Sequence, residues 1–237
     1  MVAGGDEADM TKFEPLSSFE ESRPVDSHVG ENSKPHTRGC AKSFEELKYL
    51  LSADLYRYSG KVSLGAFLQH YAVTPGYKYT VLMRACGYLK LKRAARVTGL
   101  YYVAKWMLMR ARIRYGIAIP EYTVVGPGLF INRFGGIYVH GDVVIGSNVN
   151  ITHGTMLGLV NRGRRAGTPT IGDGVFLAAR CNVVGRVTVG DRAAVGVAAV
   201  VTRDVPAGAT VAGIPAKVVN MEGSAGYINR AWTKGMA

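Results

Sequence analysis

The sequence contains little cysteine, no long apolar run and no acidic residue in a broad central stretch. Its three cysteines, Cys40, Cys86 and Cys181, form no C-x-x-C pair, which argues against a disulfide framework or a cysteine zinc site. No run of about 18 residues is both apolar and free of charge, so we expect no membrane-spanning helix. The acidic first ten residues lack the basic and apolar segments of a signal peptide, which favours a cytoplasmic protein.

The charge is unevenly distributed along the 237 residues. Residues 41–120 carry fourteen bases and three acids, with no acid between Asp54 and Glu121, whereas residues 1–40 carry eight acids and four bases. A strongly basic segment favours partners such as nucleic acid or an anionic lipid surface. No DNA- or RNA-binding motif occurs in it, so we expect no nucleic-acid partner.

Composition and periodicity divide the chain into four parts. Residues 1–42 are polar and aperiodic, which predicts a disordered leader. Residues 43–116 show helical spacing of apolar residues and form a basic helical region. Two hypotheses stay open for it. It either packs and oligomerises behind a solvated basic face, or its basic, aromatic surface binds an acidic polymer or, through residues 84–114, the inner face of an anionic membrane. Residues 219–237 form a C-terminal tail.

The remaining part, residues 117–218, follows a period of six. Large apolar residues recur at the lead position of each unit: Ile171, Leu177, Val183, Val189, Val195 and Val201. Smaller apolar residues follow four positions later: Val175, Cys181, Val187, Ala193, Ala199 and Val205. Six residues fit a short strand and a corner, and three such units close a triangular coil whose copies stack as parallel sheets. The repeat therefore predicts a mainly β fold, a parallel β-helix, with Cys181 as inert core.

This pattern resembles the hexapeptide-repeat acyltransferases, which form a left-handed parallel β-helix. It is most similar to the serine O-acetyltransferases and their relatives in polysaccharide biosynthesis. The resemblance covers about residues 115–220 and rests on three features: a two-residue slip of the repeat in "INRFGGIYV", a loop between Leu157 and Ile171, and the closing "VVTRDVPAGATVAGIPAKVV". It implies acetyl-CoA as the donor, no metal, and a homotrimer or hexamer with its sites between subunits.

The resemblance also implies which residues contact coenzyme A. Ala179 and Val197 correspond to contacts made through backbone and small side chains. Thr202, Arg203 and Lys217 correspond to positions near the adenine and the 3′-phosphate, where a cation gains charge-assisted hydrogen bonds.

The chain departs from the family at the acceptor site. The family's catalytic Asp-His pair corresponds to Asn132-Arg133, and the Arg-His pair of the loop corresponds to Gly167-Thr168. A base is still needed, because transfer to a hydroxyl requires an acceptor for its proton.

The register of the repeat points to one histidine as that base. Ile131 and Ile151 are three units apart, so they stack, and His153 is predicted one coil above Arg133, roughly 5 Å along the axis. We therefore assign His153 as the candidate base with Arg133 and Asn132 beside it, while His140 falls on another edge. The alternative is that His153 is a polar edge residue without a catalytic role.

Three functional hypotheses follow. The first is acetyl transfer to a sugar hydroxyl of an exopolysaccharide or surface polysaccharide precursor, because the serine-holding positions are replaced and the basic region could keep the enzyme near a lipid-linked substrate. The alternative is serine O-acetylation in cysteine biosynthesis. A second alternative, motivated by Arg133, is a catalytically weakened scaffold of the same fold.

Overall fold

The structure, a computed structural model, describes residues 37–233, 235 and 236. The predicted leader at 1–42 therefore lies outside the described residues except for its last six positions. The helical region contains α1 (Phe44–Ser59), α2 (Leu64–Val73), α3 (Pro75–Leu91), α4 (Arg93–Val97) and α5 (Leu100–Tyr115). No helix in the described ranges is both long and apolar enough to cross a membrane.

Local sequence signals set the ends of α1. The side chain of Ser43 accepts a hydrogen bond from the Glu46 backbone N–H at 3.0 Å, so Ser43 is the N-cap. The helix ends at Ser59 and is capped by Gly60, whose φ of 71° is a left-handed conformation that glycine adopts without the steric cost of a Cβ. Its N–H donates to the carbonyl of Tyr56.

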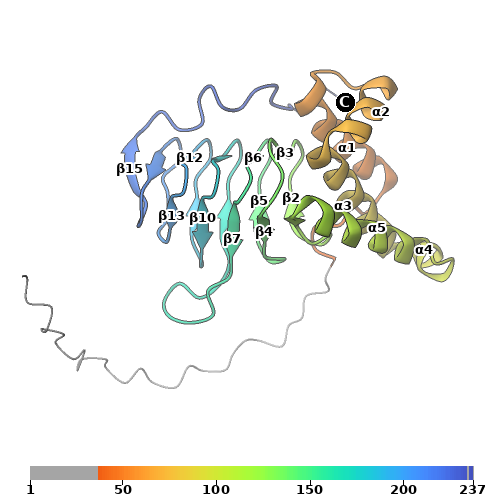
Figure 1. Ribbon diagram of the computed structural model, residues 1–237, viewed down its shortest axis with the longest axis horizontal. Helices are drawn as coiled ribbons and strands as arrows, with labels where there is room; N and C mark the ends of the chain where they lie inside the picture. The colour runs from red at the N-terminus through yellow and green to blue at the C-terminus, as the bar shows by residue number, and fades with distance from the viewer. Residues whose placement is uncertain (1–36, 234, 237) are drawn as a thin grey trace, which may run out of the picture. The chain divides into compact units, whose positions relative to one another are not determined.

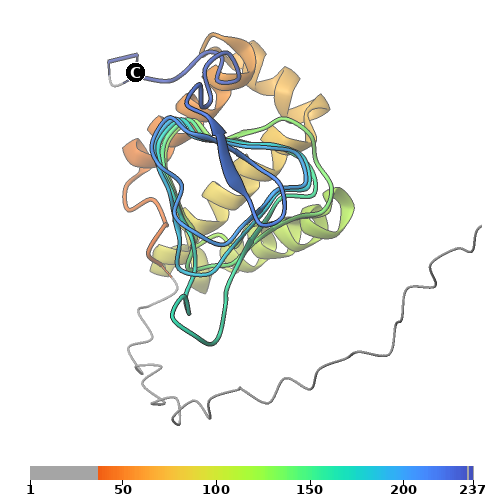
Figure 2. The same cartoon turned by 90° about the vertical axis from the view of Figure 1, so that its left-hand side faces the viewer.

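The repeat region folds as the predicted left-handed parallel β-helix. Figure 2 shows the coils superimposed as a triangle. The strands are β1 (Ile117–Ala118), β2 (Val124–Val125), β3 (Phe130–Ile131), β4 (Ile137–Val139), β5 (Val144–Ile145), β6 (Asn150–Ile151), β7 (Met156–Gly158), β8 (Thr170–Ile171), β9 (Phe176–Leu177), β10 (Asn182–Val184), β11 (Thr188–Val189), β12 (Ala194–Val195), β13 (Val200–Val201), β14 (Thr210–Ala212) and β15 (Lys217–Asn220).

Three sheets form the sides of the triangle. Sheet A has the order β1-β4-β7-β10-β13, sheet B has β11-β8-β5-β2, and sheet C has β15-β14-β12-β9-β6-β3. All pairs are parallel except β14–β15, which closes the end of the sheet antiparallel. The lead residues of the repeat lie inside, each at most 1% exposed: Ile171, Leu177, Val183, Val189, Val195 and Val201. The period of six is thus one side of the coil, as predicted.

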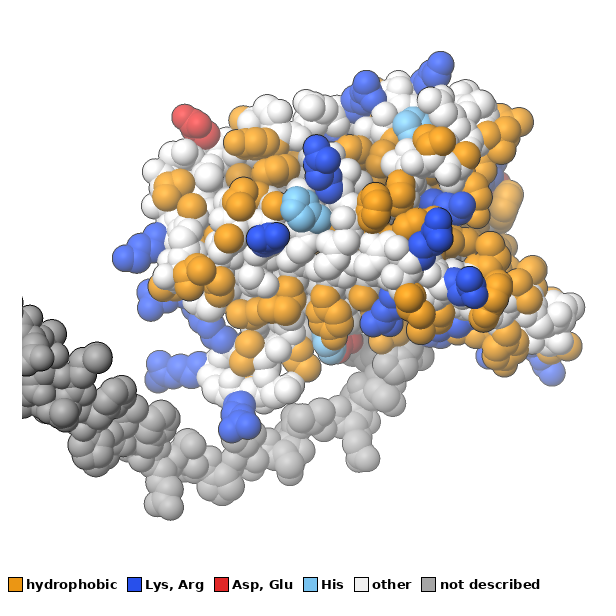
Figure 3. Space-filling model, in the orientation of Figure 1, with side chains coloured by type: hydrophobic (Ala, Val, Ile, Leu, Met, Phe, Trp, Pro, Cys, Tyr) orange, Lys and Arg blue, Asp and Glu red, His pale blue; other side chains and the backbone are white. Residues whose placement is uncertain are grey.

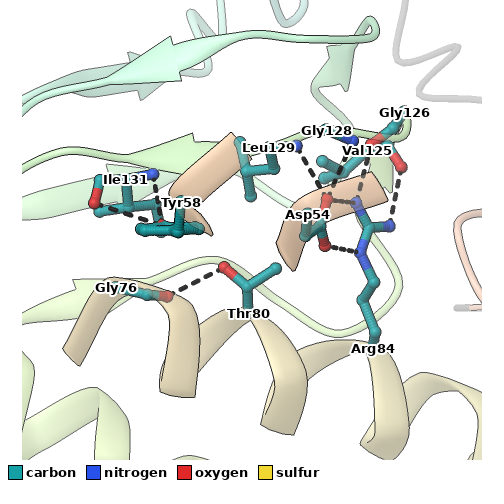
Figure 4. A network of polar contacts seen from close by, with 10 residues as sticks. All are labelled: Asp54, Tyr58, Gly76, Thr80, Arg84, Val125, Gly126, Gly128, Leu129 and Ile131. Carbon is teal, nitrogen blue, oxygen red and sulfur yellow. Dashed lines mark hydrogen bonds and ion pairs between the residues drawn. The ribbon is translucent and has the colours of Figure 1, made fainter. Parts of the chain in front are cut away.

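The helices cover the first coils of the β-helix, and buried polar contacts join them to it (Figures 1 and 4). The carboxylate of Asp54 on α1 accepts from Arg84 on α3 and from the backbone N–H groups of Gly128 and Leu129 at 3.0 and 2.8 Å. The hydroxyl of Tyr58 accepts from the N–H of Ile131 at 2.9 Å. These contacts fix the strand that leads into Asn132 and Arg133.

The C-terminal tail runs back along the β-helix toward the helices (Figure 1). Trp232 is buried and packs edge-on against the rings of Tyr49 and Tyr56 on α1. Asn148 exchanges two hydrogen bonds with the backbone of Trp232, at 2.9 and 2.7 Å. The tail therefore ties both ends of the β-helix to α1.

Candidate active site

The predicted catalytic residues gather at the corner where sheet C turns into sheet A. We call this the C–A corner; it comprises residues 132–136, 152–155, 178–181 and 196–199. The register pairs Ile131 with Ile151, as predicted, so the coil that carries His153 stacks directly on the coil that carries Arg133.

His153, Ala179 and Val197 form one column at this corner. Each follows a paired strand residue by two positions, because Ile151 pairs with Leu177 and Leu177 pairs with Val195. Backbone hydrogen bonds link the coils here: the Arg180 N–H donates to the His153 carbonyl, and the Ala198 N–H donates to the Ala179 carbonyl, both at 2.9 Å. The predicted base and two predicted coenzyme contacts therefore share one edge of the molecule.

The two-residue slip of the repeat is an insertion at the C–A corner. Ile131 pairs with Ile151 and Tyr138 pairs with Met156, so the lower coil contains two more residues than the upper one. The extra length lets Asn132, Arg133 and Phe134 stand out as exposed side chains. Gly135 and Gly136, with φ of 105° and 66°, return the chain to the strand in conformations that residues with a Cβ rarely adopt.

The imidazole of His153 is half-buried and incompletely paired. Its Nδ1 is enclosed and has no hydrogen-bond partner among the described residues. A buried polar nitrogen without a partner is uncommon and calls for a functional or solvent explanation. A catalytic imidazole is usually oriented by a hydrogen bond at its other nitrogen, and the described residues provide none to this Nδ1.

A cysteine lies at the same corner but is unsuited to be a nucleophile. Cys181 is fully buried, and the Thr155 hydroxyl lies 3.8 Å from its sulfur. Burial raises the pKa of the Cys181 thiol to about 11, so the reactive thiolate is not formed near neutral pH. The prediction that Cys181 belongs to the core agrees with this position.

The predicted loop lies at a different corner. Residues 159–169 connect sheet A to sheet B and project as a short hairpin, in which Val160 and Gly167 exchange backbone hydrogen bonds of 3.0 and 2.9 Å. Thr168 donates to the backbone carbonyl of Asp142 at 3.2 Å. His140 also lies at this A–B corner, with its Nδ1 at 3.8 Å from the Asp142 carboxylate. Within one chain, Thr168 and His153 therefore lie at different corners of the β-helix.

The other predicted coenzyme contacts lie beyond the C–A corner. Thr202 and Arg203 follow β13 at the A–B corner, and Lys217 begins β15 at the end of sheet C. Thr202 is five residues after Val197 on one coil, a span of at most roughly 17 Å in extended chain. Arg203 and Lys217 are exposed, so their charged groups can reach a ligand. Within the described residues, no cluster of three or more His, Cys, Asp or Glu could hold a metal ion.

The sequence offered no signal for a polar cluster beside this edge. Asn150, one residue before Ile151, is buried; its side-chain oxygen accepts from Arg57, and its nitrogen donates to the Tyr227 carbonyl at 2.9 Å. Arg57 is 3% exposed, and burial lowers its pKa to about 10. Its partners lie 93 and 172 positions away and follow no repeat, so only the folded chain shows the cluster.

Comparison with known proteins places this architecture in a family. No protein-family profile matches the chain. It is 33% identical over 133 residues to a serine acetyltransferase of Helicobacter pylori, a match that covers 56% of this chain and 78% of that enzyme. It is also 33% identical over 123 residues to a serine acetyltransferase of Bacillus subtilis, covering 52% of this chain and 57% of that enzyme.

Solved structures agree with this assignment. The serine acetyltransferase of Brucella abortus superposes with a TM-score of 0.61 at 25% identity, covering 74% of this chain and 70% of that one. The enzyme of Neisseria gonorrhoeae, solved with serine, gives 0.60 at 26% identity, covering 75% and 71%. These findings favour the serine alternative over the predicted polysaccharide acceptor. The chain belongs to the serine acetyltransferase family of hexapeptide-repeat acyltransferases and is an O-acetyltransferase that uses acetyl-CoA.

Proposed function

We propose that this O-acetyltransferase acts on L-serine. The observation that carries the proposal is the 33% identity over most of a serine acetyltransferase. A feature of the C–A corner is compatible with it: Arg133 is exposed on the insertion beside the His153 edge. A guanidinium can bind a carboxylate through two parallel hydrogen bonds, so Arg133 would hold the serine carboxylate in place of the residues that the family uses.

In this proposal His153 acts as the general base. The serine hydroxyl gives its proton to the imidazole, its oxygen attacks the thioester carbonyl, and the carbon–sulfur bond then breaks to release coenzyme A. The proton held by His153 passes to the departing thiolate. Asn132, exposed one residue before Arg133, would donate its amide N–H to the oxyanion of the tetrahedral intermediate. A positioned base of this kind contributes about 10²- to 10⁴-fold to the rate.

The proposed donor site follows the same edge. Acetyl-CoA would place its thioester near His153 and pass Ala179 and Val197, with Thr202, Arg203 and Lys217 toward the adenine and 3′-phosphate. Val197 is exposed, and its side chain is larger than the alanine or glycine usual at this family position. A long ligand is required, because these residues extend from the C–A corner to the A–B corner.

We further propose a trimer with the site between subunits. The loop that carries Gly167 and Thr168 lies at the A–B corner, whereas His153 lies at the C–A corner of the same chain. Serine is too small to reach from one corner to the other, so a serine site that uses both His153 and this loop needs two copies of the chain.

A sugar hydroxyl is the second candidate acceptor. It is favoured by a specific observation: all four positions that correspond to the family's acceptor-site pairs are replaced, by Asn132, Arg133, Gly167 and Thr168. An acidic sugar would satisfy Arg133 in the same way as the serine carboxylate. The two candidate functions therefore differ only in the acceptor, serine or a sugar. They share acetyl-CoA as the donor and His153 as the base.

The test follows release of the coenzyme A thiol from acetyl-CoA with L-serine, a neutral oligosaccharide or an acidic oligosaccharide. We expect O-acetylserine, and a loss of about 10²- to 10⁴-fold in His153→Ala. His140→Ala changes the imidazole at the other corner, and His70→Ala, on α2, serves as a remote control. Product from an oligosaccharide alone would replace serine by the second candidate. Acetyl-CoA binding without product from any acceptor would overturn the proposal in favour of a scaffold.

A further inference from the structure

One face of α5 exposes large apolar side chains to solvent. Leu108 and Ala111 are buried against the rest of the molecule. The opposite face carries a stripe that we call the α5 stripe, with exposures of 63%, 55%, 59%, 40% and 81% for Tyr102, Val103, Trp106, Met109 and Ile113. Trp106, Met109 and Ile113 follow Val103 at steps of three, three and four residues, and Tyr102 lies four before Trp106, which places the stripe on one side of a helix. Contiguous exposed apolar surface of this kind marks an interaction site.

Within the part of the chain that the structure describes, the charged side chains beside this stripe are all cations. Arg93 and Arg96 lie on α4, and Arg110, Arg112 and Arg114 lie on α5; all are exposed. The sequence contains no acid from residue 55 to residue 120. The guanidinium of Arg110 lies 5.2 Å from the centre of the Trp106 ring, so charge and aromatic surface meet at the middle of the stripe. Figure 3 shows hydrophobic and basic side chains over α4 and α5 and no acidic one there.

The one lysine of α5 is used internally. Lys105 donates to Glu121 at 2.6 Å, and Lys90 of α3 donates to the other oxygen of the same carboxylate at 3.2 Å. The inward cation of the helix is thus neutralised, whereas the arginines beside the stripe have no acidic partner among the described residues. Among residues 37–233, 235 and 236, no acidic side chain therefore offsets the positive charge of this outward face.

We infer that the α5 stripe and its flanking arginines bind the surface of an anionic lipid bilayer. A helix of 16 residues is about 24 Å long, so it would lie in the plane of the interface. Apolar side chains would enter the headgroup boundary, with Trp106 and Tyr102 at interfacial depth, while the arginines contact lipid phosphates. This combination of an aromatic and aliphatic stripe with purely basic flanks is typical of interfacial helices.

The make-up of this surface argues against a two-fold contact between copies and against an acidic polymer as its partner. A two-fold contact between copies would bring the α4 and α5 arginines of one copy against those of the other, with no carboxylate on α3, α4 or α5 to compensate. An acidic polymer would use the arginines and leave the apolar stripe in water. A bilayer with acidic headgroups satisfies both parts of the surface.

Docking would also place the C–A corner near the membrane. Phe134 of the insertion packs edge-on against Tyr115, the last residue of α5, with ring centroids 6.0 Å apart. The inferred binding stands independently of the acceptor. If the acceptor is a sugar, the second candidate above, membrane binding would bring a membrane-linked glycan close to Arg133 and His153. That consequence rests on the proposed function.

The test measures binding of the full chain to vesicles without any acceptor or acetyl-CoA. One set contains phosphatidylcholine alone and the other contains phosphatidylcholine with phosphatidylglycerol. We expect sedimentation with the anionic vesicles only, weakened by salt. Trp106→Ser/Ile113→Ser, and separately Arg110→Gln/Arg114→Gln, should each weaken binding by about tenfold or more. Leu64→Ser/Leu68→Ser removes equally exposed apolar side chains from α2 and is the matched control.

The chain's two tryptophans make a second readout possible. Trp106 is exposed and Trp232 is buried, so a blue shift of fluorescence on adding anionic vesicles should come from Trp106 and vanish in Trp106→Phe. The inference is overturned if anionic vesicles do not bind, if both vesicle types bind equally, or if the α2 variant loses as much as the α5 variants. It is also overturned if the α5 variants dissociate an oligomer and leave vesicle binding unchanged.

Discussion

The β-helix and the helical region are stabilised by different kinds of contact, repeated in the first and non-repeating in the second. In the β-helix, each coil buries the same positions and continues the same backbone ladder, so stability is distributed over many similar contacts. The helical region packs apolar residues of α3 and α5 into the same core as the first coils, and it adds single buried polar contacts there: Asp54 with Arg84, and Glu121 with two lysines. It also leaves the large apolar side chains of the α5 stripe exposed, whereas the lead residues of the β-helix are buried.

This difference separates the tasks of the two regions. A repeated ladder gives a rigid edge, and the C–A corner uses it to stack His153, Ala179 and Val197 in one column. The helical region is attached through the inner faces of its helices, so the outer face of α5 can stay apolar and exposed without loss of that attachment. Variants that damage one kind of contact and leave the other intact should therefore behave differently.

The largest effect is expected from the buried ion pair of the helical region. Asp54 is 0% exposed and Arg84 is 6% exposed, with the guanidinium Nε at 2.5 Å from the carboxylate. Arg84→Met should lower the free energy of unfolding by about 3–5 kcal/mol, because it leaves a buried carboxylate without its cation. Chemical denaturation measures the change.

The matched variant is the double substitution Asp54→Asn/Arg84→Met. Without the buried charge, it should recover part of the loss seen in Arg84→Met alone. A single variant as stable as the wild type would show that the helical region does not depend on this pair.

A single interior residue of the β-helix should have a comparable but smaller effect. Ile151 is fully buried and lies between Ile131 and Leu177 of the neighbouring coils. Ile151→Ala should cost about 2–4 kcal/mol through lost burial and the cavity left behind, and Ile151→Val about 1 kcal/mol. The comparison of the two losses tests whether the volume of the buried side chain sets the stability. Equal losses in Ile151→Ala and Ile151→Val would mean that it does not, and that stacking of the coils does.

The sequence alone predicted the β-helix because its determinants are periodic. The spacing of Ile131 and Ile151 gave their stacking, and with it the position of His153 above the insertion at Arg133. The contacts of the helical region could not be read in this way. Asp54 and Arg84 are 30 residues apart, and Asn148 and Trp232 are 84 apart, with no repeat to indicate either pairing. Single, non-local polar contacts carry no periodic signal.

The sequence predicted which positions of the candidate site stack along one edge of the β-helix, but not the contacts of their side chains. Register predicted that His153 stacks on the coil of Arg133, as the structure has it, but the unpartnered Nδ1 depends on which side chains surround it in three dimensions. The loop that carries Thr168 lies away from the C–A corner. Its position depends on the path that the chain takes at the A–B corner, and the length of a loop does not specify that path.

A smaller effect, with a defined pH dependence, is expected at Glu121. Burial raises the pKa of this carboxyl, but the hydrogen bond from Lys105 and the charges of Lys105 and Lys90 outweigh it and leave the pKa lowered. A lowered pKa in the folded state stabilises the protein above the pKa of the unfolded chain, and this stability is lost as pH falls through the folded value. Glu121→Gln should therefore cost about 2 kcal/mol at neutral pH, moderated by the partial exposure of Lys105.

The difference between wild type and Glu121→Gln should shrink below about pH 4, since both carry a neutral side chain in acid. Thermal unfolding across a pH series measures it. A difference that stays constant from neutral to acidic pH would show that the lysine contacts do not stabilise the attachment of α5.

The smallest effect on stability, and the sharpest contrast between the regions, is expected from two glycines. Gly135 in the C–A insertion has φ of 105° and Gly99 before α5 has φ of 81°, and a Cβ at either position would meet no atom within 4 Å. Alanine at each should therefore cost about 1 kcal/mol for the left-handed backbone alone, with no contribution from a clash.

The two variants should differ in activity despite equal stability. Gly135→Ala alters the turn that presents Asn132 and Arg133, so acetyl transfer should fall several-fold, whereas Gly99→Ala lies in the helical region and should leave turnover in solution unchanged. Steady-state rates with L-serine and acetyl-CoA, compared at equal folded fractions, measure this. Equal rates in both variants would mean that the insertion does not position the acceptor, and that the rigid part of the C–A corner, the column through His153, is sufficient for the reaction.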